Sequence, residues 1–211
     1  MLNIRNEGPQ DYESVENITR NAFYNLYIPG CVEHYLVHTM RGHKDFIHEL
    51  DFVLELDGVV IGNIMYTKAT LTDSEGNVKN ILTFGPLCIE PKYQRRGYGK
   101  LLIQYSFEKA TAMGHDTVVI FGSPSNYVSS GFVSCKKHNV CVEGGKFPAA
   151  MLVKELKTGA LDGRKWYYKS SPVMEVLPEN ANAFDNALPP KKCKHTSTQE
   201  EFYIMSHSFV E

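Results

Sequence analysis

The chain has 211 residues, of which 43% are hydrophobic and 22% are charged, an ordinary balance for a globular protein that buries a core. Its length suits one large domain, or one domain with a small appendage. The formal net charge of −2 is too close to neutral for a general nucleic-acid or membrane binder. We therefore expect no nucleic-acid partner and no membrane association, and we expect any basic cluster to serve a small anionic ligand.

The cysteines are odd in number and irregularly spaced, and no C-x-x-C pair is present, so zinc-ribbon and thioredoxin-like interpretations lack their motif. The N-terminus, MLNIRNEGPQDY, has neither the basic n-region nor the apolar h-region of a signal peptide. No apolar run approaches the roughly 18 residues that a membrane span requires. These observations predict reduced thiols in a cytoplasmic protein.

The first half of the chain predicts a strand, two helices and an antiparallel meander. Apolar residues recur at helical spacing after Pro9, and the Asp57-Gly58 pair between two β-rich runs is a hairpin signal. The expected elements are a strand at 2–5, helices at 9–23 and 32–41, and strands on both sides of Asp57-Gly58 and at 78–90.

Helical periodicity returns after the glycines of YQRRGYGK, residues 93–100, and Gly114 ends it. One face of this helix is predicted to be Leu102, Ile103, Ser106, Phe107, Ala110 and Met113, and the other Lys100, Gln104, Glu108 and Thr111. Further on we expect a buried strand at 117–122, a short helix at 123–132, and strands at 149–156 and 165–171. The order predicts a mixed α/β, or α+β, arrangement.

From Pro172 the composition becomes polar and proline-punctuated, and residues 200–209 predict one last helix. We therefore assign residues 1–171 to one domain and residues 172–211 to a C-terminal extension, packed on the domain or at an interface. The apolar segment FYIMSHSF is expected to cover either a neighbouring copy in a homodimer or the domain's own sheet.

The segment 93–100 combines positive charge and glycine between a predicted strand and a helix. The first amides of a helix have no intrahelical partner, and the helix dipole adds partial positive charge there. Gly97 and Gly99 allow a ligand to approach the main chain. Formal charge is added by Arg95, Arg96 and Lys100. This pattern predicts a phosphate site.

Three kinds of phosphate loop compete for this segment. A Rossmann fingerprint requires glycine where the chain has Leu102, and a Walker A loop requires serine or threonine where it has Leu101. The remaining form, [QR]-x-x-G-x-[GA], is filled by residues 94–99. Taken alone, the loop leaves open a glycine turn that caps a solvated basic helix.

A second motif, Tyr127-x-x-x-Gly131-Phe132, follows a predicted buried strand. Together with the loop and the strand GPLCIEP, it resembles the GNAT superfamily of acyl-CoA-dependent N-acetyltransferases. The resemblance covers about residues 1–157 in element order. The stretches GPLCIEPKYQRRGYGKLLI and FPAAMLVKEL further resemble a bacterial branch of predicted N-acetyltransferases whose substrates are mostly unassigned.

This resemblance implies a splayed mixed β-sheet flanked by helices, with acetyl-CoA bound in the split. It implies that the pantetheine arm pairs with the main chain of Leu87, Cys88 and Ile89. The implied pyrophosphate loop consists of Gln94, Arg95, Arg96, Gly97, Tyr98, Gly99 and Lys100. Asn126 is a further candidate contact, whereas the asparagine that many members carry at the position of Ile120 is absent here.

For catalysis, the resemblance implies that Tyr127 donates a hydrogen bond or proton to the departing sulfur. A phenol with a pKa of about 10 is still protonated at neutral pH, while a thiol titrates at about 8.5. The competing interpretation is a core tyrosine beside Phe132. A main-chain amide near Ile89 is a candidate donor to the thioester carbonyl. We interpret Glu90 as a solvated carboxylate, so a base acting through water, or no dedicated base, fits equally well.

The histidines raise the question of a metal. His34 and His38 have i, i+4 spacing, but the H-E-x-x-H signature is absent and two histidines make an incomplete site. We predict no metal ion. In the resembled fold this helical region lines the acceptor side, so its polar residues and three tyrosines are candidate substrate contacts, or the tyrosines belong to the core. These candidates are Glu33, His34, His38, His43, His48, Tyr24, Tyr27 and Tyr35.

We expect an acetyltransferase that moves the acetyl group of acetyl-CoA to a primary amine of a small molecule by direct attack on the thioester. One alternative is a non-catalytic acyl-CoA-binding sensor or interaction module on the same fold. Another is an enzyme that uses a longer acyl-CoA or a hydroxyl acceptor. The sequence does not identify the acceptor amine.

Overall fold

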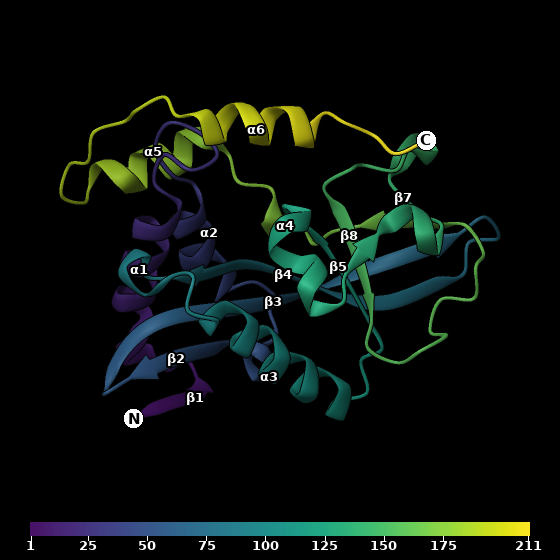
Figure 1. The fold of residues 1–211 in the computed structure, drawn as a ribbon, viewed down its shortest axis with the longest axis horizontal. Coiled ribbons are helices and arrows are strands. Elements are labelled where there is room, and N and C mark those ends of the chain that lie inside the picture. Colours follow the sequence, from purple (N-terminus) through teal and green to yellow (C-terminus); the bar gives the residue numbers. More distant parts are fainter.

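The computed structural model describes all of residues 1–211. Its centre is a mixed nine-stranded sheet in the order β1-β2-β3-β4-β5-β8-β6, in which β9 pairs with β3 and β7 (Figure 1). The strands are β1 (Leu2–Asn6), β2 (Phe52–Leu56), β3 (Val59–Asp73), β4 (Val78–Ile89), β5 (Thr117–Phe121), β6 (Val133–Ser134), β7 (Val140–Cys141), β8 (Met151–Glu155) and β9 (Trp166–Lys169). The helices are α1 (Tyr12–Phe23), α2 (Glu33–Met40), α3 (Tyr98–Ala112), α4 (Pro124–Tyr127), α5 (Pro178–Asn186) and α6 (Ser197–Ser206).

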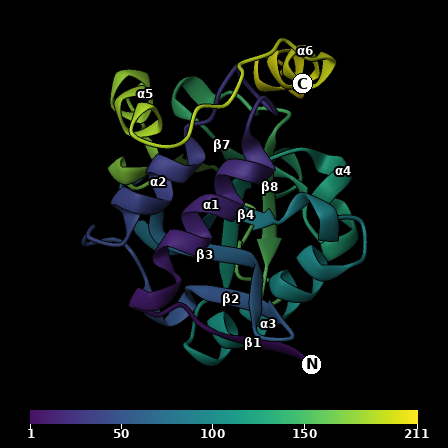
Figure 2. The ribbon, with the colours of Figure 1, turned by 90° about the vertical axis from the view of Figure 1, so that its left-hand side faces the viewer.

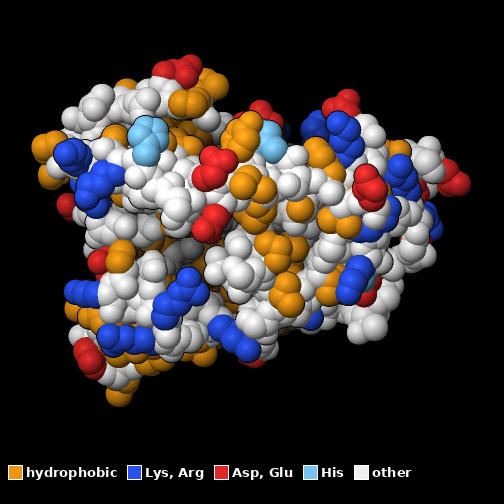
Figure 3. All heavy atoms as spheres, turned by 45° about the horizontal axis from the view of Figure 1, so that its top comes forward, with side chains coloured by type: hydrophobic (Ala, Val, Ile, Leu, Met, Phe, Trp, Pro, Cys, Tyr) orange, Lys and Arg blue, Asp and Glu red, His pale blue; other side chains and the backbone are white.

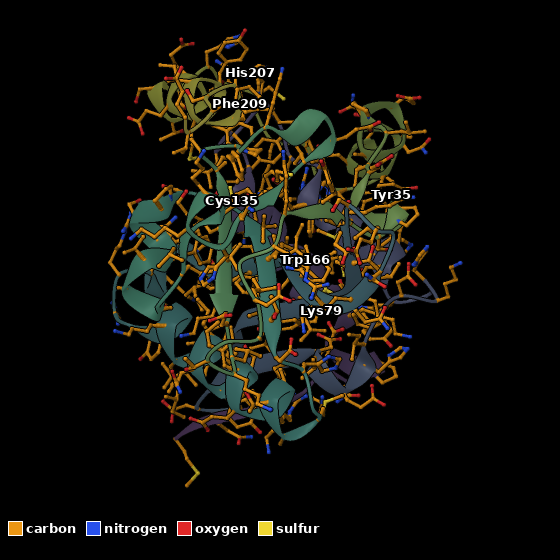
Figure 4. All side chains as sticks on the ribbon, turned by 90° about the vertical axis from the view of Figure 1, so that its right-hand side faces the viewer. Tyr35, Lys79, Cys135, Trp166, His207 and Phe209 are labelled. Carbon is orange, nitrogen blue, oxygen red and sulfur yellow. The ribbon has the colours of Figure 1, made fainter.

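The sheet is covered on both faces, with α1 and α2 on one side and α3 on the other (Figure 2). Side-chain alternation along β2 explains this arrangement. Phe52 and Leu54 belong to the core cluster that includes the buried residues of α3, whereas Val53 packs in the cluster with α1 and α2. A further cluster fills the far end of the molecule, around Trp166 and Cys135 (Figure 4). The expected mixed sheet flanked by helices is confirmed.

The sheet splays between β4 and β5. These two strands are parallel and are paired only where Leu82 meets Val118. Beyond that point β4 continues to Ile89, paired with β3 on its other edge. The Glu90 amide donates to the Ile61 carbonyl of the β3 side. Because main-chain groups of successive strand residues point to alternate edges, the amides of Leu87 and Ile89 lie on the open edge.

Several local predictions can be compared with the structure. Asp57 and Gly58 both have positive φ, 52° and 80°, as a two-residue hairpin turn requires, so the predicted hairpin is confirmed. The predicted buried face of α3 is confirmed except at Met113, which is 45% exposed. The helix ends at Ala112 and Gly114 adopts φ +90°, so the last residue of the pattern has left the helical face.

The C-terminal segment contains two helices, of which only α6 was predicted. A capping box between Thr196 and Gln199 starts α6 at Ser197, before the expected position. Helix α5 was missed because its sequence, PENANAFDN, buries only Ala181 and so has no apolar stripe. Both helices run along the top of the molecule in Figure 1.

Specific contacts hold this segment against α1 and α2. Arg20 of α1 is 4% exposed, and its Nε donates to Asp185 of α5 at 2.6 Å. The hydroxyls of Thr196 and Thr198 donate to the main-chain carbonyls of Asn25 and Leu26.

The division of the chain at residue 171 stays a prediction. No helix combines the length and the apolar composition that a membrane crossing needs.

Candidate active site

A cavity of about 560 Å³, the first cavity, opens at the splayed end of β4. In the view of Figure 3 the surface is hollowed on the left half of the molecule, with basic side chains below the hollow and both acidic and basic ones above it. The residues that line the first cavity are Ala22, Phe23, Leu26, Tyr27, Leu87, Cys88, Ile89, Tyr93, Gln94, Arg95, Gly97, Tyr98, Gly99, Lys100, Ile103, Ser123, Ser125, Asn126, Tyr127, Thr198, Glu201, Phe202 and Met205. Every predicted site residue is in this set except Arg96, whose guanidinium lies 5.8 Å from the centre of the Tyr93 ring.

The glycine loop has the geometry of an anion cradle. Gly97 precedes α3 with φ +87°, a backbone conformation that residues other than glycine rarely adopt. A Cβ built on Gly97 meets no atom within 4 Å, so its main chain faces open space. The first helical bond runs from the Leu101 amide to the Gly97 carbonyl, which leaves the amides of residues 98–100 without intrahelical acceptors. Exposed cations at Arg95 and Lys100 complete a site suited to phosphate.

Gln94 ties this loop to the strand. Its side-chain amide donates to the Ile89 carbonyl at 2.9 Å, on the open edge of β4. The side chain of Cys88 lies on the face of β4 that α1 covers, where its Sγ is 3.3 Å from Thr19 Oγ1. Burial raises the pKa of the Cys88 thiol to about 12, so it stays a neutral side chain and not a nucleophile.

Tyr127 lies at the end of α4, at the boundary of the first cavity. Its ring is half-buried, 5.8 Å from the centres of both Phe84 and Phe132. Burial raises the pKa of the Tyr127 phenol above its usual value, so the hydroxyl remains protonated through the neutral range. Gly122 makes room for the ring, because a Cβ there would stand 2.5 Å from Tyr127 Cε2.

A second cavity, of about 330 Å³, adjoins the first. The two share Phe23, Tyr27, Leu87 and Tyr127. The remaining lining of the second cavity is Glu33, Leu36, Thr83, Phe84, Gly85, Pro86, Phe121, Gly122, Tyr168, Ser170, Met174 and Glu175. Tyr127 therefore stands between two compartments, which is the arrangement that a transfer between two ligands needs.

Most of the candidate acceptor contacts on α1 and α2 do not line either cavity. The imidazoles of His34 and His38 pack on the Phe184 ring, with centroids 5.3 and 4.7 Å away. Tyr35 also packs on Phe184, and Tyr24 donates to the Lys191 carbonyl. These residues anchor the C-terminal segment. Among the predicted acceptor contacts, Tyr27 lines both cavities and Glu33 lines the second. Nowhere do three or more His, Cys, Asp or Glu side chains gather as a metal ion would require.

Helix α6 forms a wall of the first cavity that the sequence did not reveal. Thr198, Glu201, Phe202 and Met205 line the cavity, and the Phe202 ring lies 4.5 Å from the Tyr27 ring. The i, i+3 spacing of Phe202 and Met205 was a signal of one apolar face, but nothing in the tail indicated which surface that face would meet.

The match to protein families agrees with this geometry. Residues 20–135, more than half of the chain, match the model of the acetyltransferase (GNAT) family. The chain therefore belongs to this family of acetyltransferases, and the resemblance seen in the sequence is confirmed.

Individual relatives place the chain within the family. It is 32% identical over 87 residues to the uncharacterized N-acetyltransferase YjhQ of Escherichia coli, a match that spans 41% of this chain and 47% of that relative. The GNAT protein YhbS of E. coli, solved with CoA, superposes with a TM-score of 0.71 at 24% identity, over 82% of this chain and 91% of its own. A Brucella melitensis family member, solved with acetyl-CoA, gives 0.65 at 20% identity, over 83% and 99%. These two structures establish the fold.

Proposed function

We propose that this protein transfers the acetyl group of acetyl-CoA to a primary amine of a small molecule, which attacks the thioester directly. The observation that carries the proposal is the first cavity, where an anion cradle adjoins an unpaired strand edge. Such a site suits a ligand that has both a diphosphate and an amide-bearing arm able to pair as an added strand. The CoA complex of YhbS and the acetyl-CoA complex from Brucella support this donor.

Two groups of residues would hold the donor. The strand segment Leu87, Cys88 and Ile89 would pair with the pantetheine arm through the main-chain groups of Leu87 and Ile89, which lie on its open edge. The diphosphate would lie against the amides and charges of the loop formed by Gln94, Arg95, Arg96, Gly97, Tyr98, Gly99 and Lys100, with Arg96 acting from outside the cavity and Asn126 as a side-chain contact.

In the chemical step, the amine nitrogen bonds to the carbonyl carbon, the carbon–sulfur bond breaks, and the sulfur keeps the electron pair. We assign the Tyr127 hydroxyl the role of hydrogen-bond donor to that sulfur. Its raised pKa keeps the donor proton in place. The amide of Ile89, on the open edge of β4, would donate to the carbonyl oxygen as charge develops.

We propose that no side chain acts as a dedicated base at the junction. None of the four residues shared by the cavities is a carboxylate or a histidine. Glu90 accepts from the Asn21 side chain at 3.0 Å and lines neither cavity. The acceptor would therefore enter as the neutral amine, or as an ammonium ion that first loses one proton to water. After the nitrogen has bonded to the carbonyl carbon it releases a further proton, which protonates the departing thiolate.

The test is a thiol-release assay with acetyl-CoA and a panel of small primary amines, with product mass confirming one acetyl group per thiol. We expect amine-dependent release. Acetyl-CoA binding without turnover of any amine, and unchanged in Tyr127→Phe, would instead establish a non-catalytic acyl-CoA-binding module. Failure to bind acetyl-CoA would reject the donor site. Longer acyl-CoA donors in the same assay would measure chain-length preference.

A further inference from the structure

The second cavity differs in charge from the first. It is lined by two carboxylates, Glu33 and Glu175, and by no lysine, arginine or histidine. The first cavity contains Arg95 and Lys100 and a single carboxylate, Glu201. Since an anion binds best near cations and a cation near carboxylates, the two compartments are built for ligands of opposite charge.

Glu33 is held in place at the start of α2. Its Oε2 accepts from the Val32 amide at 3.1 Å and from the Cys31 thiol at 3.3 Å. These bonds orient the carboxylate, and its Oε1 accepts no hydrogen bond from the protein. Burial raises the pKa of the Glu33 carboxyl above its usual value. In its ionised form Glu33 adds to the burial that raises the pKa of Tyr27, one of the residues shared by both cavities. The carboxylate is thus electrostatically coupled to the junction.

Glu175 stands at the other side of the lining, after a short turn that follows β9. It is exposed, so it belongs to the mouth of the cavity. The lining of the second cavity also contains aromatic rings, of which Phe121 and Tyr168 pack with ring centres 5.9 Å apart. Aromatic faces accommodate both a hydrocarbon chain and an ammonium group.

We propose that the second cavity takes an acceptor with two amines separated by a hydrocarbon spacer, a diamine or polyamine. One amine reaches the junction at Tyr127 and is acetylated. The other remains an ammonium ion held by Glu33 and Glu175, which line the second cavity and not the first. This inference rests on the proposed function, since it names the acceptor of the same transfer.

The experiment compares three probes of about the same length that differ in the charge of the far end. Putrescine is a four-carbon diamine, pentylamine has a methyl group in place of the second amine, and γ-aminobutyrate has a carboxylate there. We expect kcat/KM to fall in that order, by at least about tenfold from the diamine to pentylamine, as one charge-assisted hydrogen bond would give. Calorimetric titration of each probe into the CoA-saturated protein gives the same comparison without turnover.

Glu33→Gln and Glu175→Gln keep the shape of each side chain and remove its charge. Each is expected to raise KM for putrescine about tenfold and to reduce the ratio of putrescine to pentylamine, because the far ammonium loses a partner. Glu143→Gln is the matched control, since Glu143 is exposed in a turn outside both cavities. That variant should keep the wild-type ratio.

The outcomes separate the inference from the proposed function. Equal use of pentylamine or γ-aminobutyrate overturns the diamine proposal and leaves the transferase standing. A putrescine preference that survives both substitutions overturns the role of the carboxylates. Binding of CoA with no charge preference in calorimetry also overturns it. Absence of CoA binding defeats both ideas together.

Discussion

The two cavities that meet at Tyr127 are built in different ways. In the first cavity, one continuous stretch, residues 87–100, supplies both the open strand edge and the anion cradle. It offers main-chain amides and cations. The second is assembled from segments between α1 and the turn after β9, and it offers carboxylates and aromatic rings. In the proposed function, local backbone geometry would therefore recognise the donor, and long-range side-chain packing would select the acceptor.

The largest effect is expected from Gly97→Glu, which changes the anion cradle of the first cavity. The new side chain places bulk and negative charge in the open space beside the cradle, so CoA affinity should fall at least about a hundredfold, as lost charge-assisted bonds and a new repulsion predict. Calorimetric titration of CoA measures the loss. Gly42→Glu is the control, because a Cβ at Gly42 also meets no atom and that residue lines neither cavity. Unchanged affinity in folded Gly97→Glu would reject the cradle.

Tyr127→Phe tests the boundary between the cavities. The ring and its packing on Phe84 and Phe132 are kept, so CoA binding should persist while kcat falls by about a hundredfold, the scale of a lost proton or hydrogen-bond donor. Stopped-flow or steady-state thiol release measures kcat.

The dependence of kcat on pH tests the role of the Tyr127 hydroxyl in the wild-type protein. The hydroxyl is needed in its protonated form, so the phenol limits activity only as pH rises through its pKa. Since burial moves that pKa upward from about 10, we expect no Tyr127-dependent loss of kcat below about pH 10. A loss near neutral pH that disappears in Tyr127→Phe would contradict the assignment.

Gly122→Ala should have a smaller effect on the same ring. Its backbone tolerates alanine, but the added Cβ would stand 2.5 Å from Tyr127 Cε2, so the ring must move. A displaced donor should lower kcat about tenfold with little change in CoA affinity. Kinetics with titration of CoA checks both parts, and an unchanged kcat would show that the ring position is not critical.

The smallest expected effect belongs to α6. Phe202→Ala removes a ring that lines the first cavity, so a ligand bound there would lose apolar contact with α6. A loss of about 1 kcal/mol of such contact predicts a fall in CoA affinity of about fivefold. Ile204→Ala, at a neighbouring residue that is 56% exposed, should leave affinity unchanged. Equal effects of the two variants would mean that α6 contributes stability and not a wall of the site.

Features that depend on neighbouring residues were predicted from the sequence, whereas contacts between distant segments were not. The hairpin at Asp57-Gly58, the buried face of α3 and the glycine loop follow from short-range rules of turn conformation and helical periodicity. The role of His34 was not accessible in this way. Its spacing from His38 suggested an acceptor or metal contact, but both rings pack on Phe184, far along the chain.

The amino-acid order alone determined the anion cradle, because positive φ at Gly97 and free amides at a helix start depend on adjacent residues. It also indicated the family, through motifs that are contiguous in the chain. Only the tertiary structure decided that Glu33 and Glu175 share a cavity and that α6 closes the first one. Those contacts join distant segments, and their geometry is set by the packing of the whole core rather than by any local preference.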